Sequence, residues 1–210
     1  MIKKYDVVIV GAGAAGLMCA IEAGKRGKKV ILLDHVNKIG EKIRISGGGR
    51  CNFTNINTNY KKFISSNPNF VKSALSQYSH NDFIKLISKH QIGFHEKKLG
   101  QLFCNDSAQQ IISMLKLECQ QAKVILRNNS LIKSILKTDN FIIETQDLNF
   151  EAKSLVVATG GLSIPKIGAT KFGYEIAKQF GLNIIDTSPA LVPLTFNDTL
   201  LEKCKKLAGL

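Results

Sequence analysis

The stretch that decides the fold is Val7-Val8-Ile9-Val10-Gly11-Ala12-Gly13-Ala14-Ala15-Gly16. It opens with four β-branched apolar residues, which are typical of a strand buried on both faces of a parallel sheet. Three glycines of a turn follow, and a helical pattern then runs from Ala14 to Arg26 and ends at Gly27. A second apolar run covers residues 30–34. These residues predict a βαβ unit, and with it a Rossmann-like α/β fold.

A Gly-x-Gly-x-x-Gly turn between a strand and a helix is the fingerprint of a dinucleotide-binding site. Gly11 permits the tight turn, Gly13 lets the backbone approach a pyrophosphate, and Gly16 allows the helix to pack closely on the strand. Ala14 and Ala15 belong to the helix N-terminus, where free amides and the helix dipole attract phosphate. We predict that these five residues bind a dinucleotide.

Asp34 closes the second predicted strand. A carboxylate at this place accepts hydrogen bonds from ribose hydroxyls and repels a 2′-phosphate, so we predict that Asp34 binds the ribose. The glycine turn and the carboxylate alone do not distinguish NAD from FAD. An NAD-dependent dehydrogenase with a bare Rossmann domain therefore remains an alternative on these residues.

Composition and charge restrict the classes of partner. Hydrophobic residues make up 44% of the 210 residues, and 29 lysines and arginines against 16 acidic residues leave a net charge of +13. The lysines are scattered in pairs, with no basic run and no interleaved aromatic residues of the kind that grip single strands. We therefore expect a solvated basic surface, with neither nucleic acid nor a membrane as partner.

The five cysteines form no Cys-x-x-Cys pair, and their odd number argues against a disulfide framework and against a zinc site. We therefore expect no metal, and a reducing compartment such as the cytoplasm. The histidines do not combine with acidic residues at the spacing of a triad or a metal site. Catalytic residues stay unassigned, and His90 and Glu96 are expected to serve as caps or surface residues.

Beyond the βαβ unit the chain changes character twice. Helical periodicity indicates an inserted helical segment, with a short turn at 97–100 and helices over residues 70–78, 82–90 and 107–122. Alternating apolar and polar residues then predict a β-meander over residues 124–126, 131–137 and 141–145. A doubly buried strand at 155–158 returns the chain to the sheet, and a short helix follows at 173–180.

Residues 46–55 read Ser-Gly-Gly-Gly-Arg-Cys-Asn-Phe-Thr-Asn. Three consecutive glycines allow positive φ and an exposed row of amides, which suits a phosphate or the polar edge of a flavin ring. Basic residues flank the glycines, and the thiol is either reactive or, as free cysteines more often are, a small packing residue. The cofactor-binding residues predicted in this region are Lys42, Ser46, Gly47, Gly48, Gly49, Arg50 and Cys51.

The sequence resembles the HI0933-like family of NAD(P)/FAD-dependent oxidoreductases, whose hallmark is an SGGGRCN-x-TN segment soon after the first βαβ unit. Residues 155–161, Leu-Val-Val-Ala-Thr-Gly-Gly, resemble the second motif of FAD enzymes of the glutathione reductase type, and residues 173–177 and 189–194 agree with the family further. The resemblance implies FAD as the cofactor. It also implies that Thr159, Gly160 and Gly161 approach the dinucleotide. From its place at the start of the predicted meander, Ile132 is expected to contact the dinucleotide on the adenine side.

The resemblance implies a flavoprotein oxidoreductase that transfers hydride between FAD and an unidentified small molecule or NAD(P)H, the possible electron donor. Residues 1–188 would form the FAD-binding domain and residues 189–210 the start of a substrate domain, which family members continue well past this point. We therefore expect a fragment, a truncated gene product, or half of a split protein that a second chain completes. The alternative function is a nucleotide-binding remnant without turnover. Gln101 and Lys171 depart from the family pattern.

Overall fold

The computed structural model describes residues 2–188 and 196–207. The chain divides into two compact units, Met1–Ile176 and Ala177–Leu210. Every residue that the sequence predicts to hold the dinucleotide belongs to the first unit.

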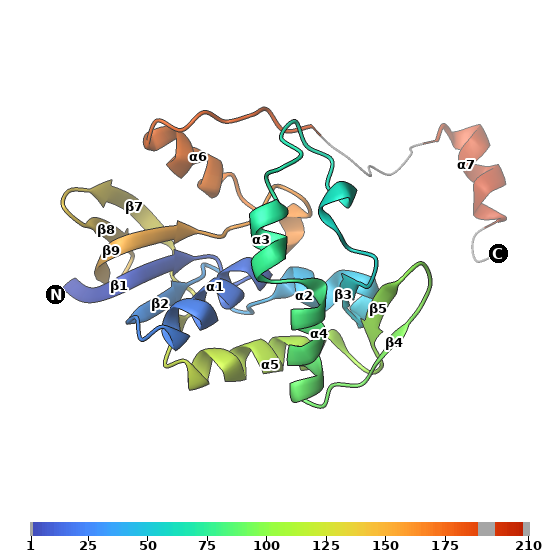
Figure 1. Ribbon diagram of the computed structural model, residues 1–210. Helices are drawn as coiled ribbons and strands as arrows, with labels where there is room; N and C mark the ends of the chain where they lie inside the picture. The colour runs from blue at the N-terminus through green and yellow to red at the C-terminus, as the bar shows by residue number, and fades with distance from the viewer. Residues whose placement is uncertain (1, 189–195, 208–210) are drawn as a thin grey trace. The chain divides into compact units, whose positions relative to one another are not determined.

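The central sheet of the first unit has the strand order β6-β2-β1-β9-β8-β7 (Figure 1). β1 (Ile2–Val10) pairs in parallel with β2 (Val30–Leu33) and with β9 (Asn149–Val157). β8 (Phe141–Thr145) and β7 (Ile132–Lys137) continue the sheet beyond β9 as antiparallel strands. The structure thus confirms the Rossmann-type α/β fold and the presence of a meander.

Two details of the predicted sheet are wrong. β6 (Ile125–Arg127) does not open the meander but pairs in parallel with β2 at the edge of the sheet, so the meander consists of β7, β8 and β9. The strand predicted over residues 155–158 is not buried on both faces, because Val157 is 40% exposed. An apolar or alternating pattern indicates which residues of a strand are apolar. It does not indicate which strand pairs with it or what covers its faces.

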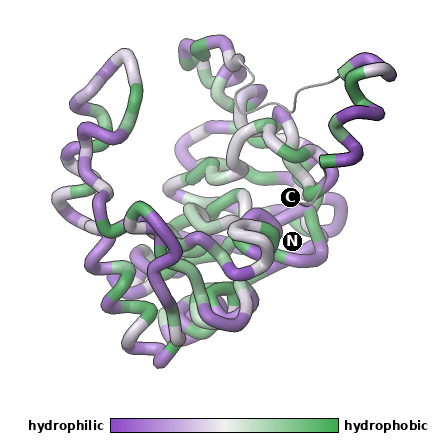
Figure 2. The backbone as a smooth tube through the Cα atoms, turned by 90° about the vertical axis from the view of Figure 1, so that its right-hand side faces the viewer, coloured by the Kyte–Doolittle hydropathy of each residue, from purple (hydrophilic) through white to green (hydrophobic). Residues whose placement is uncertain are grey.

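Two helices pack on each other and on the parallel strands. Leu17 and Ile21 of α1 (Ala14–Lys25) are fully buried in the same hydrophobic cluster as Leu115 of α5 (Ala108–Gln121). Each such side chain contributes about 1.5–3 kcal/mol of hydrophobic stabilisation. Hydrophobic residues gather on the inner strands and hydrophilic residues on the outer turns (Figure 2). This core holds α1, and therefore the glycine turn before it, at the carboxyl end of β1.

The inserted segment contains the predicted helices and also a small sheet. α3 (Lys72–Gln77), α4 (His80–Lys89) and α5 correspond to the three helical patterns. The small sheet is antiparallel and has the order β3-β5-β4. Its strand β3 (Asn52–Asn55) precedes α3, and its strands β4 (Phe94–Glu96) and β5 (Gln101–Cys104) lie between α4 and α5. Sequence analysis missed these strands, because three or four residues are too few to establish an alternating pattern. β3 begins three residues after Gly49, and its pairing with β5 anchors the end of the triple-glycine loop.

The second unit holds the end of α6 (Phe172–Gln179) and α7 (Asp198–Lys205), whose N-terminus is capped by the side chain of Asn197. Residues 189–194, on which part of the family resemblance rests, lie outside the described residues. The domain boundary expected at residue 188 stays a prediction. Among the helices of the described residues, none has the length and apolar character needed to span a membrane.

Candidate functional site

Two glycines of the fingerprint are required by packing. Gly11 has φ +105°, and a Cβ atom there would lie 2.5 Å from the carbonyl oxygen of Ala158. A Cβ atom on Gly16 would lie 1.8 Å from the carbonyl oxygen of Gly11. Distances this short exclude any side chain unless the backbone shifts. The turn is therefore built against the end of β9, the strand that carries the second predicted motif.

Gly13 is different, because no atom lies within 4 Å of a Cβ built on it. It is the N-cap of α1, no side chain caps this helix, and its first turn carries no acidic residue. Ala14 and Ala15 behind it are exposed. An uncapped helix N-terminus beside open space fits a pyrophosphate, because the free backbone amides and the helix dipole both favour an anion.

Asp34 lies next to the glycine turn and is nearly buried, with 9% of its surface exposed. Its Oδ2 accepts a hydrogen bond of 2.6 Å from the amide of Ala12, and its Oδ1 accepts one of 3.1 Å from the amide of Val36. The carboxylate thus ties the fingerprint to the end of β2, a structural role that sequence analysis did not foresee. The ribose contact stays a prediction.

The triple glycine adopts the backbone conformation expected of it. Gly47, Gly48 and Gly49 have φ values of 59°, 65° and 85°. They lie in η1 (Ser46–Gly49), which directly follows the short helix α2 (Glu41–Ile45). A Cβ on Gly47 would lie 2.7 Å from the Phe103 ring, whereas open space faces Gly48 and Gly49. The loop thus packs on β5 through its first glycine. The contact of Gly48 and Gly49 with a flavin stays a prediction.

Arg50 and Cys51 follow the loop with opposite exposure. Arg50 is exposed, and its backbone carbonyl accepts a hydrogen bond of 2.9 Å from the amide of Cys104. Cys51 is 5% exposed, and its burial raises the pKa of the thiol, although a hydrogen bond with Ser46 opposes this. A buried thiol with a raised pKa stays protonated at neutral pH, which agrees with the packing interpretation of Cys51.

Lys42 brings the two predicted flavin motifs together. Its Nζ donates a hydrogen bond of 3.2 Å to the carbonyl oxygen of Gly161, across 119 positions of sequence, and lies 3.6 Å from a Cβ built on Gly160. A Cβ on Gly173, at the start of α6, would lie 2.5 Å from the Thr159 Oγ1. The fingerprint and the Thr-Gly-Gly turn therefore meet at the carboxyl edge of the parallel strands, where α/β proteins bind nucleotides. Lys42 of α2, the helix that leads into the SGGGRCN loop, is bonded to the same edge.

The tertiary structure also adds residues that sequence analysis missed. Ser130 donates its amide to the Asp34 carbonyl at 2.8 Å, and the Asn128 side chain donates to the Asn37 carbonyl at 2.7 Å. A Cβ on Gly168 would lie 3.2 Å from the His35 Nε2. No local pattern marks these residues, because each reaches the site from a loop distant in sequence.

Ile132, the predicted adenine-side contact, is the first residue of β7 and pairs with Thr145. The contact with the Asp34 region comes from Ser130, two residues earlier, whose amide donates to the Asp34 carbonyl. Its contact with adenine stays a prediction.

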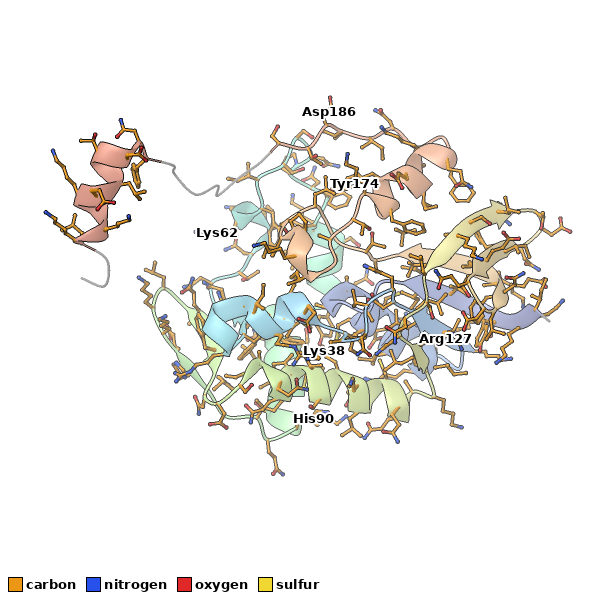
Figure 3. The ribbon with its side chains drawn as sticks, turned by 180° about the vertical axis from the view of Figure 1, so that it is seen from behind. Lys38, Lys62, His90, Arg127, Tyr174 and Asp186 are labelled. Atoms are coloured by element: carbon orange, nitrogen blue, oxygen red, sulfur yellow. The ribbon has the colours of Figure 1, made fainter. Side chains whose placement is uncertain are left out.

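The unassigned polar residues have structural partners. The Glu96 Oε1 accepts from the amide of Gly100 at 3.0 Å, which confirms a capping role. His90, labelled beside α5 in Figure 3, lies 2.8 Å from the buried carboxylate of Glu118, which also pairs with Lys25 and Lys89. Burial alone would raise the pKa of Glu118, but the hydrogen bonds from these three residues outweigh it and hold the pKa at about 2. This cluster joins α1, α4 and α5.

An open hollow lies elsewhere, at the first residues of β1. It is lined by Lys4, Tyr5, Asp6, Lys29, Asn140, Glu151, Ala152 and Lys153. None of these residues belongs to the three motifs, and the hollow is at the amino end of β1, whereas open α/β sheets bind ligands outside the carboxyl ends of their strands. We therefore assign the site by its motifs and not by this hollow.

Comparison with known families agrees with this geometry. Residues 5–206 match the HI0933-like protein Rossmann domain, which is nearly the whole chain. The chain belongs to the HI0933-like family. Membership confirms the resemblance carried by the SGGGRCN loop and the Thr-Gly-Gly turn, and it gives the chain a Rossmann-type FAD-binding fold.

Curated relatives share the family. The chain is 49% identical over 208 residues to a ribosomal RNA dihydrouridine synthase of Escherichia coli, covering 99% of this chain and 52% of the relative. The same name belongs to a relative from Haemophilus influenzae, 48% identical over 95% of this chain and 51% of the relative. A 3-dehydro-bile acid delta(4,6)-reductase of Clostridium scindens is 27% identical over 89% of this chain. The HI0933-like chain spans about half the length of these curated relatives.

Solved structures show the same fold at low identity. Glycine oxidase from Geobacillus kaustophilus superposes with a TM-score of 0.60 at 16% identity, covering 86% of this chain and 59% of that chain. A flavocytochrome c3 fumarate reductase superposes with a TM-score of 0.56 at 20% identity, covering 84% and 40%. These likenesses show the fold alone.

Proposed function

We propose that this chain is the FAD-binding part of a reductase that acts on uridine in ribosomal RNA. The observation that carries the FAD assignment is the meeting of the fingerprint and the Thr-Gly-Gly turn at one edge of the parallel sheet, to which the hydrogen bond from Lys42 to Gly161 joins the helix before the SGGGRCN loop. FAD needs such an extended edge, because its pyrophosphate, ribose and flavin ring require separate polar contacts.

We assign one group of described residues to each of these contacts. The pyrophosphate would lie at the uncapped N-terminus of α1, between Gly13 and Ala15, and Asp34 would accept from the ribose. The flavin side would be held by residues of the SGGGRCN loop and of the Thr-Gly-Gly turn. Bound FAD supplies two-electron redox chemistry that no amino-acid side chain offers. We propose NAD(P)H as the electron donor.

The substrate proposal rests on the relatives. Two proteins with 48–49% identity over nearly this whole chain are named ribosomal RNA dihydrouridine synthase. Converting uridine to dihydrouridine adds one hydride and one proton across a carbon–carbon double bond of the base, a reaction suited to a flavoprotein. The chain's net charge of +13 is complementary to RNA. We therefore replace the expectation of a small-molecule substrate without nucleic acid by an RNA substrate.

Two further expectations remain proposals. The cytoplasm, where ribosomal RNA is found in bacteria, agrees with five free cysteines, three of which are buried. Because the chain matches only about half of each relative, we propose that further residues or a second chain supply the rest of the substrate site. The same half-length match keeps one alternative, a nucleotide-binding protein without turnover.

The test has two parts. An absorbance spectrum of the purified chain, with mass identification of the nucleotide released by heat, is expected to show FAD. Deleting the gene in its host is then expected to remove dihydrouridine from a nuclease digest of ribosomal RNA measured by mass spectrometry. A chain that neither contains nor takes up FAD would refute the cofactor. Unchanged dihydrouridine with FAD present would favour the alternative without turnover.

A further inference from the structure

The SGGGRCN loop, called the flavin loop below, and the segment that follows it share an unusual charge pattern. From Lys42 to Asn81 the sequence contains six lysines and arginines and not one aspartate or glutamate, although acidic residues flank it on both sides. The chain as a whole has one acidic residue for about two basic ones. Forty consecutive residues without a negative charge form a surface that attracts a polyanion and lacks the internal ion pairs of an ordinary solvated face.

The same segment exposes large apolar side chains. Ile64 is fully exposed, Phe70 is 77% exposed, and four further side chains are exposed by 38–43%: Ile56, Tyr60, Phe63 and Tyr78. Two aromatic residues flank a pair of lysines in Tyr60-Lys61-Lys62-Phe63. Lys62 is labelled in Figure 3. Sequence analysis found no interleaved aromatic residues, and that reading is wrong for this segment. The aromatic residues and lysines of this segment are irregularly spaced in the sequence, and their common exposure in the structure shows that they form one surface.

The segment keeps its shape without burying these rings. Side-chain oxygens of its asparagines accept backbone amides two residues on: Asn55 from Asn57 at 2.8 Å, Asn59 from Lys61 at 3.0 Å, and Asn67 from Asn69 at 3.1 Å. Such turns hold a backbone by local hydrogen bonds. Because the turns provide the local order, Phe63 and Phe70 are not needed as a core, and their rings stay available to a partner.

One pair shows how charge and ring combine. The Nζ of Lys72, at the start of α3, lies 4.6 Å from the centre of the Tyr60 ring. The ammonium group therefore lies over one face of a partly exposed ring. Single-strand-binding proteins combine such positive charge with aromatic rings, which hold phosphates and stack on bases.

Hydrogen bonds hold the start of the segment close to the flavin loop. The amide of Ile56 donates to the Gly100 carbonyl at 2.9 Å, and the Asn55 side chain donates to the Leu99 carbonyl at 3.0 Å. β3, which leads into the segment, begins three residues after Gly49. A strand lying along the segment would therefore lead toward the glycine loop.

We propose that residues 56–78 form a binding surface for single-stranded RNA, which delivers a base toward the flavin loop. The proposal rests on the proposed function and deepens it, since it names where the RNA substrate is held. RNA fits better than a protein partner because the surface combines stacking rings with positive charge and has no negative charge to pair with a basic or mixed partner. Phosphates would bind Lys61, Lys62 and Lys72, and bases would stack on Tyr60 and Phe63.

The test uses the 210-residue chain and a fluorescein-labelled oligouridine followed by fluorescence anisotropy. The variant Lys61→Gln/Lys62→Gln/Lys72→Gln is expected to bind about 100-fold more weakly at low salt, with a salt slope smaller by about two, because each lost phosphate contact removes about 0.7. Tyr60→Ser and Phe63→Ser are each expected to weaken binding about tenfold through lost stacking.

A matched control removes the same charge elsewhere. Lys3→Gln/Lys116→Gln/Lys133→Gln takes three exposed lysines from β1, α5 and β7, and it is expected to bind RNA within about threefold of the unchanged chain. Equal losses in the control and in the segment variant would overturn the proposal, because binding would then follow net charge alone. Circular dichroism and FAD absorbance of every variant verify that the fold is kept.

Two other results have separate meanings. If sedimentation shows that the chain self-associates through the segment, and Phe63→Ser or Phe70→Ser abolishes this without changing RNA affinity, the surface is a protein interface and the proposal fails. If the unchanged chain binds FAD but no RNA at low salt, the proposal fails together with the RNA substrate, whereas the FAD assignment stands. RNA binding that survives in the segment variants overturns this surface alone.

Discussion

Gly13→Val is expected to separate FAD binding from folding. No atom lies within 4 Å of a Cβ at this position, and its backbone angles of φ −82° and ψ −171° suit a β-branched residue. Stability should therefore fall only by about 1 kcal/mol, the cost of valine as an N-cap. The new side chain would fill the space in front of the α1 N-terminus and displace the pyrophosphate.

The loss of affinity follows from the contacts removed. Two amide hydrogen bonds to a charged phosphate are worth about 1.5–3 kcal/mol each, so at least about 3 kcal/mol is at stake, or about 100-fold in Kd. FAD fluorescence titration of the apo chain measures the affinity, and thermal unfolding measures the stability. The variant is thus expected to fold normally and to bind FAD at least about 100-fold more weakly.

Two controls bracket this variant. Gly27→Asn changes the other end of α1, where φ is +73° and a Cβ meets open space, and FAD affinity should not change. Gly16→Ala puts a Cβ 1.8 Å from the Gly11 carbonyl oxygen, so the fold itself should be damaged. If Gly13→Val binds FAD as tightly as the unchanged chain, the pyrophosphate does not lie at this helix N-terminus and the reasoning is refuted.

Three further changes have expected outcomes. Glu118→Gln should lower the free energy of unfolding at pH 7 by about 3 kcal/mol, since a folded pKa of about 2 against an ordinary 4.5 stabilises the fold above pH 4.5. In the unchanged chain this stabilisation should disappear as the pH falls from about 5 towards 2. Chemical denaturation at several pH values measures the free energy of unfolding, and the same pH dependence in Glu118→Gln and the unchanged chain would contradict the prediction. Lys42→Met should weaken FAD binding about tenfold with little change in melting temperature, because it removes one exposed charge and its bond to Gly161; equal affinity would place the flavin elsewhere. Iodoacetamide at neutral pH should alkylate Cys204 well before Cys51, whose thiol is buried and has a raised pKa, as peptide mass mapping would show; the reverse order would make Cys51 a reactive thiol.

The sequence by itself determined the first βαβ unit and its chemistry. A β-branched run, three glycines and a helix ending at Gly27 are contiguous, and each of their signals depends on neighbouring residues only. The same holds for the positive φ values of Gly47 to Gly49, since consecutive glycines reveal their conformational freedom directly. The family resemblance rested on such contiguous motifs, and the match over residues 5–206 confirms it.

Only the tertiary structure decided which motifs meet. The Lys42 to Gly161 bond spans 119 positions, and the Asp34 carboxylate turns back to the amide of Ala12 across 22 positions. The pairing of β6 with β2 and the small β3-β5-β4 sheet likewise depend on partners distant in the chain. Exposure is equally non-local, which is why the rings of residues 56–78 became visible as a surface only once the fold left them outside its core. Local sequence encodes turns and helices, whereas contact between remote segments depends on how the whole chain packs.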